Sequence, residues 1–313
     1  MQGDPAVAAY LARLRVERGC SPRTLAGYGR ELALLARLAQ PRAWDAVTEA
    51  DVRRWVAAAA REQLSPASIA RRLSAWRGFF AWLAERGGVQ SNPVGGVRAP
   101  RRARRLPKAL SPDLAARLVG RAPEKDDAFE RVRDKALIEL LYSSGLRLSE
   151  LTGLDARYVE HDGAASSGWL SRGEAEVQVL GKGGKRRTVP VGRHALDALD
   201  RWLAVRQSWL ALHPQADARA LFLTRRGTRL SNRAVQVRVR QLALERGIPA
   251  DVHPHVLRHS FASHLLQSSG DLRAVQELLG HASIASTQVY TSLDFQRLAA
   301  VYDAAHPRAR TKG

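Results

Sequence analysis

Residues 65–88 read SPASIARRLSAWRGFFAWLAERGG, and this stretch decides the fold of the first part of the chain. Ser65 can cap a helix with its hydroxyl while Pro66 occupies the first helical position. Gly87-Gly88 is a typical helix stop. Between these signals, apolar side chains recur at helical spacing. They are Ile69, Leu73, Trp76, Phe79, Phe80 and Leu83.

Three further helices are predicted on the N-terminal side of this stretch. Ser21-Pro22 repeats the Ser-Pro start, and Thr48-Glu49-Ala50-Asp51 fits a capping box. Apolar residues again recur with the helical period. They are Tyr10, Leu11 and Leu14, then Leu32, Leu35 and Leu38, then Val52, Trp55 and Val56. Residues 1–97 therefore predict an all-helical domain of four helices.

A basic segment follows this helical domain. Residues 98–108 read RAPRRARRLPK, with six basic residues, two prolines and no acid. Such a composition resists helix and strand, so residues 98–110 are expected to form an extended linker. The segment is either a solvated tether or a strap that lies along DNA phosphates. In the second case the contacts come from Arg101, Arg102, Arg104 and Arg105.

A larger, mainly helical domain is predicted from Ser111-Pro112, the third Ser-Pro start, to residue 313. Within it, residues 174–192 read EAEVQVLGKGGKRRTVPVG and change the apolar period from helical to two. This pattern predicts an antiparallel β-hairpin with a glycine-rich basic turn. The basic residues around its tip either keep the protein in solution or bind DNA. They are Lys182, Lys185, Arg186 and Arg187.

Composition favours a polyanionic partner. The 313 residues hold 50 Lys and Arg against 30 Asp and Glu, a net charge of +20, which favours nucleic acid. No apolar run approaches the roughly 20 residues that span a bilayer, and the N-terminus lacks a signal-like apolar core. The single cysteine, Cys20, excludes an internal disulfide and a thiolate metal cluster. A cytoplasmic protein is expected.

Residues 140–154, LLYSSGLRLSELTGL, place Arg147 three residues before Glu150. At that spacing the carboxylate can orient the guanidinium. Such a pair is often a surface ion pair of little consequence. Here, however, eight apolar residues lie in the same segment and just before it. An arginine in such surroundings needs an anion. Glu150 supplies only part of that requirement.

Residues 253–271, HPHVLRHSFASHLLQSSGD, place His255 and Arg258 at the opening of a helix, where free N–H groups favour a phosphate. A zinc site of His255, His259 and His264 is disfavoured because the HExxH glutamate is missing and no carboxylate cluster accompanies them. No metal site is predicted. His259 and His264 are expected to be structural, hydrogen-bonded within the helix packing.

Residues 279–296 read LGHASIASTQVYTSLDFQ. Gly280 is expected to be a left-handed helix cap that directs His281 out of the helix. Tyr290 has two interpretations. It is either a half-buried core aromatic, as most tyrosines are, or a nucleophile whose high pKa is offset by nearby cations.

Four motifs in this order resemble the tyrosine recombinase family of site-specific DNA integrases, and the resemblance covers nearly the whole chain. The motifs are GLRLSEL, GKGGKRR, HPHVLRHSF and LLGHASIASTQVY. The resemblance implies a mainly α fold: a helical core-binding (SAM-like) domain, then a mainly α catalytic domain with a small antiparallel sheet. Residues 156–174 are longer than the family's usual connection into the hairpin, so the hairpin motif aligns in more than one way. Lys185 is therefore the alternative to Lys182 as the catalytic lysine. Glu150 supports the first arginine of the implied catalytic set. That set is Arg147, Lys182, His255, Arg258, His281 and Tyr290.

The resemblance also implies a reaction without metal or other cofactor. The two catalytic arginines would clamp the scissile phosphate, and Tyr290 would form a 3′-phosphotyrosyl intermediate while His255 manages its proton. Lys182 would protonate the leaving 5′-oxygen, and His281 would bind the phosphate or orient the nucleophile. Strand exchange follows by transesterification.

The C-terminal run, from SSGDLRAVQELLGH to YDAAHPRAR, is most similar to the family's bacterial chromosome-dimer resolvases. That similarity implies a dif-like DNA site, a XerD-like partner recombinase in a heterotetramer, and a septal DNA translocase of the FtsK type. Roles in chromosome partition and cell division follow. The amphipathic segment 293–305 is expected either to pack on its own domain or to dock on a neighbouring protomer.

Several alternatives stay open. A phage- or element-encoded integrase and a XerD-type recombinase share this chemistry, and target-site choice separates them. A type IB topoisomerase would relax DNA without strand exchange. A DNA-binding protein that keeps the fold without catalysis would form no covalent adduct, and a metal-dependent nuclease would be sensitive to chelator.

Overall fold

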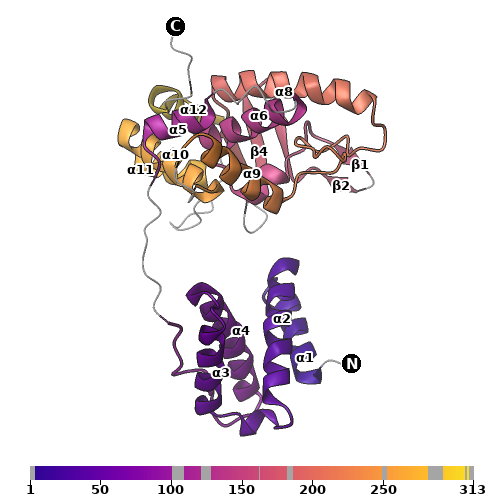
Figure 1. Cartoon of the computed structure of the whole chain (residues 1–313), viewed down its shortest axis with the longest axis vertical. Coiled ribbons are helices and arrows are strands. Elements are labelled where there is room, and N and C mark those ends of the chain that lie inside the picture. The colour runs from indigo at the N-terminus through magenta and orange to yellow at the C-terminus, as the bar shows by residue number, and fades with distance from the viewer. Residues whose placement is uncertain are drawn as a thin grey trace. The chain divides into compact units, whose positions relative to one another are not determined.

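The computed structural model describes residues 4–100, 109–120, 128–161, 163–181, 186–248, 252–280, 292–306 and 309. The chain divides into two compact units, Met1–Arg105 and Leu106–Gly313 (Figure 1). None of the described helices is both long enough and apolar enough to cross a membrane.

The first unit contains the four predicted helices. Ser21 and Ser65 accept hydrogen bonds from the N–H groups of Thr24 and Ser68, and Thr48 and Asp51 form the expected capping box. A short 3-10 turn, η1, joins the second and third helices. The elements are α1 (Pro5–Val16), α2 (Pro22–Ala39), η1 (Trp44–Ala46), α3 (Glu49–Arg61) and α4 (Pro66–Glu85).

Aromatic side chains of α4 form the centre of this unit. Trp76 and Phe79 are completely buried, and Trp76 donates from Nε1 to the carbonyl of Glu31 at 2.8 Å. Trp55 of α3 meets Trp76 edge-on at 6.0 Å between ring centroids. Each such side chain contributes about 1.5–3 kcal/mol through burial, so α4 holds the other helices around it.

The second unit contains eight described helices. Among them, α6 is buried on almost every side from Arg133 to Ser144, as expected for a central helix. Figure 1 shows α8 running beside it. The helices are α5 (Pro112–Val119), α6 (Ala128–Ser144), α7 (Leu148–Thr152), α8 (Arg193–Ala211), α9 (Asn232–Glu245), α10 (Pro254–Ser269), α11 (Leu272–Leu279) and α12 (Ser292–Ala305).

The predicted hairpin is present as strands β4 (Glu176–Leu180) and β5 (Arg186–Pro190), with Val177 opposite Val189. A third antiparallel strand, β3 (Gly168–Ser171), extends it to the order β3-β4-β5. The sequence did not predict β3. It comes from the extension at residues 156–174, which also supplies a two-residue pair, β1 (Glu160–His161) and β2 (Ala164–Ala165).

The C-terminal helix α12 packs on its own unit. Leu298 and Tyr302 are buried in a cluster with Phe261 and Leu265 of α10 and with apolar residues of α11. Of the two expectations for residues 293–305, packing on the same unit is the arrangement seen here. Docking on a neighbouring protomer stays a prediction.

Candidate active site

The first component of the site is the N-terminal end of α7. The carboxylate of Glu150 accepts from the backbone N–H of Arg147 at 2.8 Å and from Nη1 of the same residue at 2.8 Å. The Glu150 side chain is only 6% exposed, whereas that of Arg147 is 34% exposed. As the spacing predicted, the carboxylate holds the arginine in one orientation, and about a third of the Arg147 side chain stays exposed.

The second component is Arg187, which lies within strand β5 and not around the hairpin tip. Its guanidinium donates to both oxygens of Glu150, at 2.7 Å and 2.8 Å, and its side chain is 8% exposed. Placing it with the basic tip was therefore wrong. Side chains two apart on a strand share a face. Because Val189 is apolar and buried, its position in the sequence indicates that Arg187 also faces inward.

The third component is Arg258 of α10. It donates to the carbonyls of Gly145, at 2.5 Å, and Leu279, at 2.6 Å. Burial lowers the pKa of Arg258 to about 10, and the positive charge of Arg147 contributes to the same shift. A partly buried cation beside a second positive charge is stabilised by a nearby anion, so this position favours an anionic ligand.

These three arginines converge on the C-terminal end of α11. The carbonyls of Leu278, Leu279 and Gly280 accept from Arg187, Arg258 and Arg147, in that order. Free carbonyls and the helix dipole make such an end attractive to cations. Gly280 has the predicted left-handed conformation, with φ +64°, and a Cβ there would lie 3.1 Å from the Arg187 side chain.

Among the described residues, the cluster holds three guanidinium groups and one carboxylate: Arg147 and Arg187 donate to Glu150, whose charge also acts on Arg258. Burial alone would raise the pKa of Glu150, but its bonds to Arg187 and Arg147 outweigh burial and leave that pKa below its ordinary value. The carboxylate therefore stays ionised and cannot neutralise all three cations. The arrangement is suited to binding a phosphate diester.

Comparison with known proteins gives the family. The model of the phage integrase family matches residues 109–297, and that of the phage integrase N-terminal SAM-like domain matches residues 7–87. A tyrosine recombinase XerC of Ralstonia pickettii (strain 12J) is 59% identical over 315 residues, covering 98% of this chain and 95% of the relative. The chain belongs to the tyrosine recombinases of the phage integrase family. It is a site-specific DNA recombinase.

Further relatives support the resemblance to XerC proteins that the C-terminal run indicated. The tyrosine recombinase XerC of Serratia marcescens is 47% identical over 307 residues, covering 97% of this chain and 95% of the relative. Solved recombinases share the fold. XerH bound to a palindromic difH substrate, after cleavage, has a TM-score of 0.64 at 20% identity, covering 95% of this chain and 84% of that one.

A dimer of lambda integrase bound to a core site has a TM-score of 0.62 at 18% identity, with 90% of this recombinase and 98% of that chain covered. At such identities the comparison shows the fold alone. The expected mainly α architecture, with a SAM-like helical domain and a catalytic domain that holds a small antiparallel sheet, is therefore confirmed.

The histidines of α10 divide into two kinds. His264 is buried and bonded to the hydroxyl of Tyr142 and the carbonyl of Leu110, each through one ring nitrogen, so it is structural as predicted. His259 is exposed, and the expectation that it packs within the helices was wrong. His255 is exposed in the first turn of α10, one turn before Arg258.

Several sequence-predicted site residues lie outside the described residues. They are Lys182, Lys185, His281 and Tyr290 of the site, and Arg101, Arg102, Arg104 and Arg105 of the linker. The described Arg186 is exposed at the start of β5, with its guanidinium 5.2 Å from the ring centroid of Trp169. The structure thus brings together Arg147, Glu150, Arg187 and Arg258.

We expect Glu150→Gln to destabilise the recombinase by about 3 kcal/mol near neutral pH, because two buried guanidinium bonds lose their carboxylate. The folded-state pKa of Glu150 lies below its ordinary value of 4.5. Its contribution is therefore complete above that value and is lost as pH falls through the lowered pKa. Urea unfolding from about pH 7 to about pH 3.5 should show a shrinking difference in the free energy of unfolding between variant and wild type. A difference that stays constant contradicts the pairing.

Gly145→Ala is expected to cost about 2 kcal/mol or more and to slow DNA cleavage. Gly145 has φ +55°, and a Cβ there would lie 2.4 Å from the ring of Phe261 in α10, the helix that presents Arg258. Gly270→Ala is the matched control, because its φ is +67° and nothing lies within 4 Å of its Cβ position. It should cost only the backbone strain of about 1 kcal/mol. Equal losses in the two variants, measured by denaturant unfolding, would refute the packing argument.

Proposed function

We propose that this recombinase cuts and rejoins DNA through a 3′-phosphotyrosyl intermediate, with Tyr290 as the nucleophile. The observation that carries the proposal is the convergence of Arg147, Arg187 and Arg258 on the carbonyls at the end of α11, where Glu150 pairs with the first two. A site with excess positive charge on fixed guanidiniums stabilises the charge that grows on a five-coordinate phosphorus. The chemistry needs no metal or other cofactor.

The arginines have different roles in this proposal. Arg147 is partly exposed and Arg258 donates to main-chain carbonyls, so these two bind the non-bridging oxygens of the scissile phosphate. Arg187 is buried and fully engaged with Glu150 and the Leu278 carbonyl, and it therefore positions them. The phosphate replaces carbonyls of α11 as the partner of the first two.

The remaining catalytic assignments follow the family motif. His255 manages the proton of Tyr290, and its exposed place one turn before Arg258 on α10 suits contact with a bound substrate. Lys182, with Lys185 as the alternative, protonates the leaving 5′-oxygen. His281, the residue after Gly280, hydrogen-bonds the phosphate or orients the nucleophile.

We assign the DNA-binding parts as residues 1–97, a core-binding helical domain, and residues 98–110, a basic linker. Residues 111–313 form the catalytic domain with its C-terminal interaction tail. The net charge of +20 supports wrapping of a duplex. Phosphate contacts are assigned to a basic set of Arg101, Arg102, Arg104, Arg105, Lys185 and Arg186, while Arg187, included with that set by sequence, acts from inside the site.

The biological reaction we propose is resolution of chromosome dimers at a dif-like site. Identities of 47–59% to XerC recombinases over nearly the full chain support this choice over an element-encoded integrase or a XerD-type enzyme. The partner is then a XerD-like recombinase in a heterotetramer, and a septal translocase of the FtsK type activates it.

A plasmid with two directly repeated copies of the candidate dif-like site tests the proposal. We expect resolution into two circles when the recombinase, its XerD-like partner and the translocase are all present, with the chelator added to the recombination step only, and none when either recombinase is left out. Efficient resolution by this chain alone would favour an element-encoded integrase. Relaxation of supercoils without resolution would indicate a topoisomerase.

A further inference from the structure

Helix α7 is too short to set its own direction. It has five residues, Leu148–Thr152, and is therefore only about 7.5 Å long. Its main-chain bonds are few, among them Leu151 N–H to the Arg147 carbonyl at 3.0 Å and Gly153 N–H to the Ser149 carbonyl at 3.1 Å. A helix of this length is not stable by itself. What holds its two ends decides where Arg147 points.

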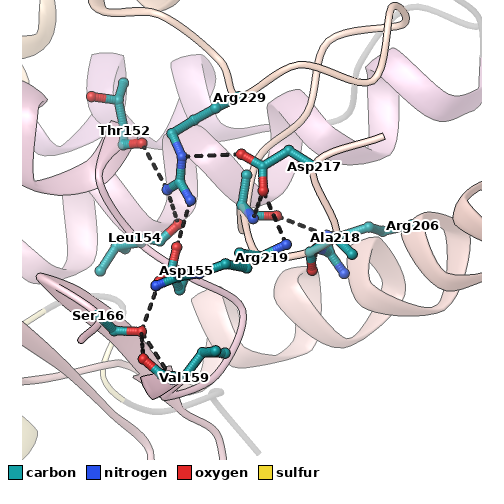
Figure 2. Close-up of polar contacts among 11 residues, drawn as sticks. Thr152, Leu154, Asp155, Val159, Ser166, Arg206, Asp217, Ala218, Arg219 and Arg229 are labelled. Carbon is teal, nitrogen blue, oxygen red and sulfur yellow. Dashed lines mark hydrogen bonds and ion pairs between the residues drawn. The ribbon is translucent and has the colours of Figure 1, made fainter. Parts of the chain in front are cut away.

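The C-terminal end of α7 is held by Arg229 (Figure 2). Nη1 of this arginine donates to the carbonyls of Thr152, at 3.4 Å, and Leu154, at 2.9 Å. Nη2 donates to Oδ1 of Asp155 at 2.5 Å. One guanidinium thus binds the last carbonyl of the helix and the two residues that follow its C-cap. A cation at this end also complements the helix dipole.

Asp155 joins this end of the helix to the sheet. Its side chain is 5% exposed, and its second oxygen accepts from Ser166 at 2.7 Å and from Arg219 at 3.2 Å. Its backbone N–H donates to the Gly168 carbonyl at 2.8 Å, and its own carbonyl accepts from Leu170 at 3.1 Å. Strand β3 is therefore bonded to Asp155 on both main-chain groups. That strand belongs to the sheet that supplies Arg187 to the active-site carboxylate.

The segment behind these residues is itself fixed, as Figure 2 shows. Asp217 pairs with Nε of Arg229 at 3.4 Å and accepts from the N–H groups of Arg219 and Ala220. Arg206 of α8 donates to the carbonyls of Ala218 and Ala220, at 2.7 Å and 2.9 Å. The contacts on α7 thus come from a connected network in which Asp155 and Arg206 are buried and Arg229, Asp217 and Arg219 are partly exposed.

We propose that Arg229 and Asp155, the α7 clamp, are positioning residues that fix the direction of α7 and thereby place the Arg147 guanidinium against the scissile phosphate. The clamp acts from the end of the helix opposite Arg147. The inference rests on the proposed role of Arg147 in binding that phosphate.

The variant that tests the clamp is Arg229→Met. It removes three donors from the end of α7, while Asp155 keeps Ser166 and Arg219 as partners, so the fold is retained. A shift of about 1 Å in a catalytic group can cost about a hundredfold in rate. We expect at least a tenfold slower single-turnover cleavage of a nicked suicide duplex at saturating protein, with the Kd for the same duplex changed less than threefold.

Arg238→Met is the matched control. Arg238 also binds a buried aspartate, Asp134, whose side chain is 3% exposed. The carboxylates described as bonded to it lie on α6 and α9. Asp134 keeps Arg133 as a partner. The control should lower the thermal midpoint by a similar amount and leave the cleavage rate within twofold of wild type.

A second substrate separates positioning from general damage. Replacing the scissile phosphate by a neutral methylphosphonate removes the charge that Arg147 is proposed to neutralise. If Arg229 acts by placing Arg147, the defect of Arg229→Met should shrink to within about threefold on this substrate. A defect of the same size on both substrates, or equal slowing by Arg229→Met and Arg238→Met, would overturn the clamp. Failure of the wild-type protein to cleave the phosphate duplex, even with the XerD-like partner present, would instead contradict the proposed function.

Discussion

Tyr290→Phe is expected to abolish covalent adduct formation with a nicked suicide duplex while leaving DNA affinity within about twofold. Without the phenolic oxygen there is no nucleophile, and losing a nucleophile typically costs several orders of magnitude in rate. The measurement is a denaturing gel after incubation in EDTA, with a duplex that holds the candidate dif-like site.

Two comparisons make the Tyr290 result decisive. Arg147→Lys and Arg258→Lys keep the nucleophile but lose the planar fork that binds two phosphate oxygens, so they should form adduct slowly. A covalent adduct in Tyr290→Phe would move the nucleophile to another residue. No adduct in the wild type on any site, even with a XerD-like partner, would indicate a DNA-binding protein without catalysis and would return Tyr290 to the structural interpretation.

Arg187→Met is expected to destabilise the recombinase by about 3–5 kcal/mol and to slow cleavage at least a hundredfold. The substitution removes two bonds to the buried Glu150 carboxylate and leaves that charge with Arg147 as its partner in the site. It also frees the Leu278 carbonyl at the end of α11. For a domain of this size the thermal midpoint should fall by roughly 10 °C.

Arg186→Met is the control in the adjacent position of the same strand. Arg186 is exposed and lies over the ring of Trp169, so its loss should change stability by less than about 0.5 kcal/mol. Because Arg186 is assigned as a phosphate contact, the substitution should lower DNA affinity and reduce the slope of log K against log salt by about 1. If Arg187→Met instead changes only the salt slope and preserves stability, Arg187 is a DNA contact and not a positioning residue.

Short-range signals in this sequence predicted much of the structure correctly. Ser-Pro starts and a capping box mark the beginnings of α2, α3, α4 and α5, and the change to a period of two marks β4 and β5. The pairing of Arg147 with Glu150 also follows from their spacing, since groups three residues apart meet at a helix end.

Other features needed the folded chain. Strand β3 was missed because GWLS, at residues 168–171, is too short to show a period and becomes a strand only by pairing with β4. Arg187 was grouped with its basic neighbours because net charge along a segment does not show which face of a strand each residue occupies. His259 was taken as packed because helical spacing alone does not show which faces of α10 are covered.

By itself, the sequence determined the helical units, the hairpin, the order of the catalytic motifs and the recombinase family. All of these depend on residues close together in the chain or on motif identity. The tertiary structure alone decided that Arg147, Arg187 and Arg258 meet at the carbonyls of α11, and that Arg229 holds the opposite end of α7. These contacts join residues from 21 to 133 positions apart, and only packing of the core brings such distant polar groups within bonding distance.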